Sequence, residues 1–226
     1  MRRALILAAA LAACAVAASP AAATNECRGL MVCVPVIGPW VSTGADGVEF
    51  QLACPPRYVV GGLDAELSSR GIDVGFVGAL GSPVNPGITT AKEALFLGRH
   101  VRGRDLAPSF RPLIGCVPAQ GGGRRSPTAY HAFPPTKPTA REVKTVRVRA
   151  GARTLAVARC PKGQRLVSAT HALAFYGSTP PTAANIQAVT VRQSVAAGVV
   201  RLTIRAKRSI AETPTIVQLD LLCVPR

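Results

Sequence analysis

Aromatic residues are scarce in this chain, which has one Trp, three Tyr and six Phe among 226 residues. They do not interleave with the basic segments, so the stacking platform that single-stranded nucleic acid requires is lacking. The same scarcity argues against a carbohydrate-binding site. We therefore expect neither a nucleic-acid nor a carbohydrate partner.

Motifs of catalysis and of cofactor binding are also missing. The sequence contains no Gly-x-Ser-x-Gly elbow, no Walker loop and no His-Glu-x-x-His. It has no Cys-x-x-Cys, so zinc ribbons and thioredoxin-like redox sites have no support. We predict no catalytic residue, no metal ligand and no cofactor, and do not expect an enzyme.

One group of polar residues is compatible with a hydrolase, which is the less favoured alternative function. Asp64 and Glu66 have the i, i+2 spacing that places both side chains on one face of a strand, with Asp73 nearby. Such a group suits acid–base chemistry or calcium binding. A solvated face that balances Arg57 and Arg70 explains the carboxylates more simply, and His171 fits a packed or edge position in a strand.

Only the N-terminus carries a long apolar run. Residues 1–23 combine a basic start, an apolar stretch and small residues ending at Ala23, which is typical of a secretory signal peptide. Cleavage near Ala23 would release a secreted or extracytoplasmic protein. The segment Leu11–Cys14 also matches a lipobox, so a lipid anchor at Cys14 is the alternative. No other stretch approaches the ~20 apolar residues of a membrane span.

The remaining six cysteines predict disulfides, because an even number in an exported chain favours pairing. "CP" at Cys54 and Cys160 is followed after 62 and 63 residues by "CVP" at Cys116 and Cys223. This spacing predicts the pairs Cys54–Cys116 and Cys160–Cys223, which leaves Cys27 to pair with Cys33.

The repeated pattern of "CP" followed by "CVP" indicates an internal duplication. The order of apolar runs, turns and Pro-bearing loops also agrees between the two segments that carry this pattern. Short alternating runs predict strands. The expected fold is all-β, with two tandem antiparallel β-sandwich repeats that each contain one disulfide. The expected segments are the signal peptide (1–23), a Cys27–Cys33 segment (24–40), repeat 1 (41–118), a Gly/Pro-rich basic linker (119–142) and repeat 2 (143–226).

The step Cys160-Pro161-Lys162-Gly163, the apolar strand after it and the closing cysteine resemble repeats in small exported β-rich proteins of high-GC bacteria. Those proteins are largely uncharacterised, so the resemblance implies an exported β fold and no catalytic residue. Pro56-Arg57 stands in repeat 1 where repeat 2 has the Lys-Gly step. In repeat 1, Gly61-Gly62 predicts a bulge or a close backbone contact.

Acidic residues are nearly absent from the second half. The first half (Thr24–Pro118) has eight Lys/Arg and eight Asp/Glu, whereas the second half (Ala119–Arg226) has 17 Lys/Arg and three acids, a net charge of +14. Codon bias explains a high arginine content but should affect both halves alike. A field of one sign attracts polyanions. An anionic wall polymer or acidic lipid headgroups are therefore the expected partners, and a structural envelope protein with no ligand is the alternative.

Two strand-like runs supply the candidate binding residues. "TVRVRA" and "VVRLTIRAK" alternate apolar and basic positions, so each run is expected to present one basic face. If the two strands share a sheet, their charges form a single stripe. Its residues are Arg147, Arg149, Arg201, Arg205 and Lys207. The sequence does not predict an oligomeric state.

Overall fold

The computed structural model describes residues 26–28, 32–44, 46–78, 92–101, 103, 105–119 and 140–226. Strands dominate this part of the chain and all of their pairings are antiparallel, which confirms the all-β class. The strands of the first half are β1 (Val34–Ile37), β2 (Trp40–Ser42), β3 (Val48–Ala53), β4 (Tyr58–Leu67), β5 (Ile72–Gly78), β6 (Glu93–His100) and β7 (Ser109–Pro118). Those of the second half are β8 (Ala140–Arg147), β9 (Arg153–Arg159), β10 (Gln164–Phe175), β11 (Val189–Ala196), β12 (Val199–Ala206) and β13 (Thr215–Pro225). Two helical turns, α2 (Ala183–Gln187) and η2 (Arg208–Ile210), lie between strands of the second half.

Several expectations fall outside the described residues: the signal peptide (1–23), the lipidation site Cys14 and residues 120–139 of the expected linker. The expected linker extends to residue 142, but residues 140–142 already belong to β8. The strands of the first half likewise begin at Val34, before the expected boundary at Val41. No helix in the described part of the chain is long and apolar enough to cross a membrane.

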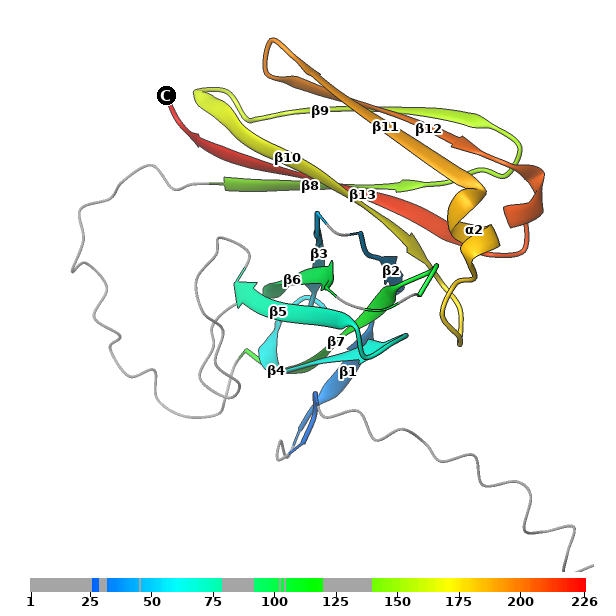
Figure 1. Ribbon diagram of the computed structural model, residues 1–226. Coiled ribbons are helices and arrows are strands. Elements are labelled where there is room, and N and C mark those ends of the chain that lie inside the picture. Colours follow the sequence, from blue (N-terminus) through cyan, green and yellow to red (C-terminus); the bar gives the residue numbers. More distant parts are fainter. Residues whose placement is uncertain are drawn as a thin grey trace, which may run out of the picture.

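One large sheet runs through both halves of the chain (Figure 1). Its strand order is β1-β7-β2-β10-β13-β8, and β4 pairs with the other edge of β7. The short strand β2 makes the connection, because Val41 lies opposite Phe110 of β7 and opposite Ala174 of β10. Two three-stranded sheets, β3-β6-β5 and β11-β12-β9, complete the fold. The two halves are therefore joined by a continuous hydrogen-bonded ladder.

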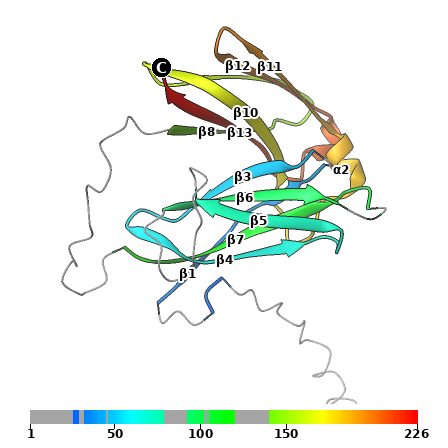
Figure 2. The same ribbon diagram turned by 60° about the vertical axis from the view of Figure 1, so that its left-hand side comes forward.

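Strand β10 contributes to two hydrophobic cores. Ala172 and Ala174 are buried in the core of the first half, together with Phe96 and Phe110. Phe175, the last residue of β10, is buried in the second core, with Val217 and Leu219 of β13 among others. Strand β13 is buried along most of its length because sheet β9-β12-β11 covers one face and β3 contacts the other (Figure 2). This two-sided burial includes polar side chains, because Gln218 and Asp220 of β13 are also buried.

The described residues include three disulfides, Cys27–Cys33, Cys54–Cys116 and Cys160–Cys223, and they are the pairs that the spacing of the cysteines predicts. Each long bridge ties the residue after a strand of a small sheet to a strand of the large sheet. Three residues after the first cysteine of each bridge the backbone has a positive φ, at Arg57 (72°) and at Gly163 (84°).

The pair Gly61-Gly62 fulfils both expectations for it. The ladder between β4 and β7 shifts register between Val60 and Gly62, so Gly61 forms a bulge. Gly62 lies opposite Gly115, and a Cβ atom on either residue would overlap the carbonyl group of Glu26. The missing side chains therefore leave a notch in the large sheet that holds the segment around Cys27.

We expect Gly62→Ala to lower the free energy of unfolding by about 1–3 kcal/mol, the usual cost of overpacking. The methyl group has no free space, so the backbone at Glu26 must move away from the sheet. Gly75→Ala is the matched control, because its Cβ would meet only Leu97 at an ordinary 3.9 Å. Urea denaturation measures both variants. Equal small losses would show that the notch does not hold the segment tightly.

Candidate functional site

The basic residues of β12 lie on the solvent-facing side of the small sheet β9-β12-β11. Val200, Leu202 and Ile204 are buried, whereas Arg201 and Arg205 are exposed. This is the alternation that the sequence predicted for the strand, with one apolar face on the core and one basic face in solvent. Figure 1 shows this sheet at the outer surface of the second half.

Strand register brings further arginines to the same side. Arg205 lies opposite Arg153 of β9 and opposite Thr190 of β11. Thr203, two residues earlier on β12, lies opposite Arg192 of β11. The solvent-facing positions of the three strands include five arginines and no carboxylate. We call these residues the arginine face: Arg153, Arg159, Arg192, Arg201 and Arg205.

Within the described residues, no ion pair involves a member of the arginine face. The direct opposition of Arg153 and Arg205 is unfavourable by a few tenths of a kcal/mol, because like charges on neighbouring strands repel. Two apolar side chains are also exposed here, Leu155 at 65% and Val157 at 49%. The face thus combines uncompensated positive charge with exposed apolar surface.

A hollow of about 290 Å³ lies within the arginine face. It is lined by three guanidinium groups and two hydroxyls, from Arg153, Arg192, Arg205, Thr190 and Thr203. All of these side chains donate hydrogen bonds, and hydroxyls also accept them. The hollow is suited to an anion rather than to a cation.

The condition for a single stripe of five residues, that the two basic strands share a sheet, is not met. Arg147 ends β8, and Arg149 follows it in the turn toward β9, so both belong with the large sheet rather than with β12. They line a separate groove of about 570 Å³ between β8 and β9, together with Lys144 and Arg153. Lys207 follows the end of β12 and is exposed. The periodicity located each basic face correctly, but it carries no information on which strands pair.

Sequence reasoning missed three members of the arginine face, Arg153, Arg159 and Arg192. They occupy alternating strands, in "RTLAVAR" and "VTVRQSV", where exposed arginines are compatible with the pattern. In β9, however, the solvent-facing positions between Arg153 and Arg159 are the apolar Leu155 and Val157. From sequence alone, the apolar Leu155 and Val157 would be expected to face the core, which would place the wrong side of β9 in solvent. The pairing of β9 and β11 with β12 was therefore needed to identify these arginines.

A buried charged network joins the two halves. Nη1 of Arg141 donates to Oδ2 of Asp220 at 2.7 Å and to Oε2 of Glu49 at 2.8 Å. The side chain of Asp220 is 2% exposed and that of Arg141 is 9% exposed. Nearby, the amide of Gln218 bonds both the N–H and the carbonyl of Gln51 in β3, at 2.6 and 3.0 Å.

The network perturbs both of its buried ionisable groups. Burial raises the pKa of the Asp220 carboxyl above its ordinary value, and the Arg141 guanidinium opposes this rise. Burial lowers the pKa of Arg141, but its bonds to Asp220 and Glu49 outweigh that effect, so the net shift is upward. Arg141 therefore remains charged, and it compensates the charge of Asp220.

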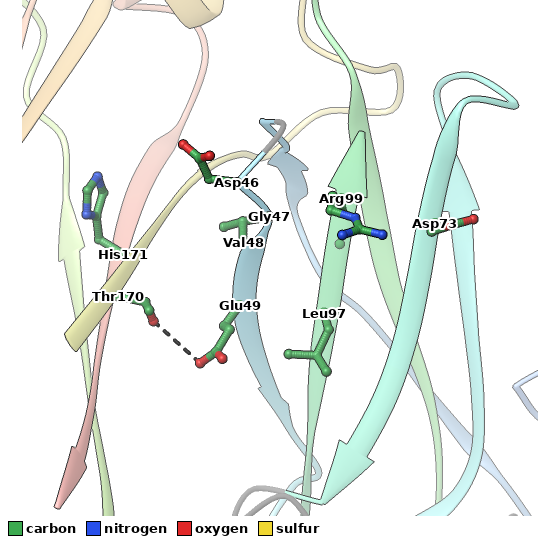
Figure 3. A pocket seen from close by; sticks show the side chains of 10 residues that line it. Asp46, Gly47, Val48, Glu49, Asp73, Leu97, Arg99, Thr170 and His171 are labelled. Carbon is green, nitrogen blue, oxygen red and sulfur yellow. Dashed lines mark hydrogen bonds between the residues drawn. The ribbon is translucent and has the colours of Figure 1, made fainter. Parts of the chain in front are cut away.

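A second cavity, of about 400 Å³, lies where the halves meet and is lined by polar residues including Asp46, Glu49, Asp73, Arg99 and His171. Figure 3 shows the hydroxyl of Thr170 directed at Glu49, whereas the imidazole of His171 lies apart from Arg99 and Asp73. Nδ1 of His171 is 2.9 Å from Oε1 of Gln193 on β11. Within the described residues no carboxylate is hydrogen bonded to this ring.

No protein-family model, no curated protein and no solved structure matches this chain.

The candidate acid–base residues of the first half are dispersed. Glu66 pairs with Arg111 of β7 at 3.4 Å rather than with Arg57 or Arg70, and Oδ1 of Asp64 accepts from the N–H of Ala65. Asp73 lies on β5, in a different sheet from β4. No group of His, Cys, Asp and Glu in the described part of the chain is placed to hold a metal ion.

Proposed function

We propose that this protein is an exported, non-catalytic binding module that holds an anionic polymer or surface through its second half. The observation that carries the proposal is the arginine face, where five exposed arginines gather with no carboxylate among them. The repulsion between Arg153 and Arg205, which lie opposite each other, slightly destabilises the folded protein. A bound polyanion would remove it.

The arrangement of the sheets supports a division of roles between the halves. In the first half, Glu49 and Gln51 of the small sheet are used for contacts with the second half. In the second half, the small sheet presents its outer face to solvent. The neutral half therefore supports the basic half, which is consistent with the confinement of net charge to the second half.

We also propose that the two halves are tandem repeats, each a β-sandwich with one internal disulfide, that share the large sheet through β2. The registers support this. The bulged residues Gly61 and Val167 each follow the first cysteine of a long bridge by seven positions. The three disulfides are consistent with an extracytoplasmic location.

The test uses the intact protein, because the halves share a sheet. The double variant Arg201→Glu with Arg205→Glu is expected to weaken binding of a polyanion such as long-chain polyphosphate by at least about tenfold, since each basic residue near an anionic surface contributes ~1 kcal/mol. Wild-type binding should also weaken strongly between about 0.1 M and 1 M salt, where the screening length falls from ~10 to ~3 Å. Fluorescence anisotropy measures both effects.

The matched control reverses the same number of charges in the first half, with Arg70→Glu and Lys92→Glu, both of which are exposed. This control should bind nearly as well as the wild type. An equal loss in both double variants would mean that only net charge matters. No binding of any polyanion at moderate salt would favour a structural envelope protein with no ligand.

A further inference from the structure

We propose that the ligand is a linear phosphate polymer, which runs from the hollow on the arginine face, past Arg153, into the groove between β8 and β9. This inference rests on the proposed function and adds the chemical class and the path of the ligand. It is drawn from two concave surfaces and from the residue that they share.

The hollow on the arginine face suits a tetrahedral oxyanion. Arg153, Arg192 and Arg205 come from three adjacent strands, so their guanidinium groups approach the hollow from different directions. Guanidinium forks bind phosphate oxygens in bidentate fashion. A phosphate group presents oxygens in several directions, whereas a carboxylate presents two in one plane. Three converging forks with the hydroxyls of Thr190 and Thr203 are therefore better matched to phosphate.

The groove between β8 and β9 provides a second set of cationic side chains. It is lined by Lys144, Arg147, Arg149 and Arg153, and no carboxylate is among its lining residues. Lys144 is positioned by a 3.0 Å hydrogen bond from Nζ to the carbonyl oxygen of Val157, which leaves two further N–H donors. Strands β8 and β9 belong to different sheets of the second half (Figure 1), and each is the end strand of its sheet.

Arg153 lines both the hollow and the groove. The two basic surfaces therefore meet at this residue, one on the outer face of a sheet and the other between the edges of two sheets. A planar bilayer contacts one of these surfaces but cannot follow both. A flexible chain with regularly spaced phosphates bends from one to the other, which is why the arrangement favours a polymer over a membrane.

The experiment compares long-chain polyphosphate with tripolyphosphate on the intact protein, at equal phosphate concentration and about 0.1 M salt. Long chains occupy both surfaces, and the second contact becomes intramolecular, so they are expected to bind at least about tenfold more tightly per phosphate. Arg153→Gln should abolish most of this advantage because it removes the shared residue. Arg165→Gln, an exposed arginine on β10 outside both surfaces, should preserve it.

Three outcomes would overturn the path while leaving the proposed function intact. They are equal affinity per phosphate for short and long chains, an equal loss in Arg153→Gln and Arg165→Gln, and tighter binding of polyglutamate than of polyphosphate at equal charge. Binding of phosphatidylglycerol vesicles without binding of polyphosphate would assign the arginine face to a membrane instead. Failure of every polyanion to bind would refute the proposed function itself.

Discussion

Replacing Arg141 by methionine is expected to lower the free energy of unfolding by about 3–5 kcal/mol, the cost of breaking a buried ion pair by removing one partner. The substitution keeps much of the apolar stem, so packing changes little. It deprives the carboxylate of Asp220 of the one cation that pairs with it among the described residues, while that group stays 2% exposed. Part of the interface between the halves depends on the same guanidinium, through Glu49.

The loss should depend on pH in a defined direction. Burial already raises the pKa of Asp220, and removing Arg141 raises it further because the guanidinium lowers it. A carboxyl with a raised pKa in the folded state contributes stability below its ordinary pKa and loses that contribution as the pH rises through the folded value. The deficit of Arg141→Met relative to wild type should therefore be smallest in acid and largest near neutral pH.

Arg147→Met on the same strand is the control, since Arg147 is exposed and makes no ion pair with another described residue. Its effect on unfolding should stay within about 0.5 kcal/mol. Urea titrations of both variants at acidic and neutral pH decide the matter. A deficit of Arg141→Met that is small or independent of pH would mean that Asp220 finds other solvation when its partner is removed.

Removing the bridge between Cys160 and Cys223 by a double substitution to alanine is expected to cost about 4 kcal/mol. The bridge closes a loop with a sequence separation of 63 residues, and the loop-entropy model predicts a cost of this size for that length. Cys223 is fully buried, and the bridge fastens sheet β9-β12-β11 to the large sheet. The arginine face should consequently become less ordered, with weaker binding of polyanions.

The comparison variant removes the bridge between Cys27 and Cys33, which have a sequence separation of only six. The same model gives about 2 kcal/mol for so short a loop. Chemical denaturation of the two double variants under oxidising conditions measures the difference. Equal losses would show that native-state contacts, rather than chain entropy, set the contribution of each bridge.

Local features of the fold followed from the sequence because they depend on local chemistry. Alternation placed Arg201 and Arg205 in solvent and Leu202 in the core. The glycine pair at Gly61 and Gly62 indicated both a bulge and a close contact, because few other residues permit either. The repeated spacing of cysteines gave the disulfide pairs without knowledge of the strand order.

Features that depend on the pairing of distant strands could not be predicted from the sequence. The Gly- and Pro-rich residues before Arg141 predict a linker there, yet Arg141 forms an ion pair with Asp220 across the ladder between β8 and β13. Arg153 and Arg205 are 52 positions apart and become neighbours only through register. Neither composition nor periodicity specifies register, so both the buried network and the full arginine face required the structure.

The position of β2 has a consequence for how the chain reaches its folded form. This three-residue strand is paired on both sides, and its partner β10 lies more than a hundred residues later in the sequence. Until β10 is in place, Val41 and its neighbours present an unpaired edge, and such edges recruit strands from other chains. A crowded population of half-folded chains would exchange second halves, each β2 accepting the β10 of a neighbour, to give domain-swapped dimers. Rapid pairing of β10 with the β2 strand of its own chain would therefore prevent this exchange during folding.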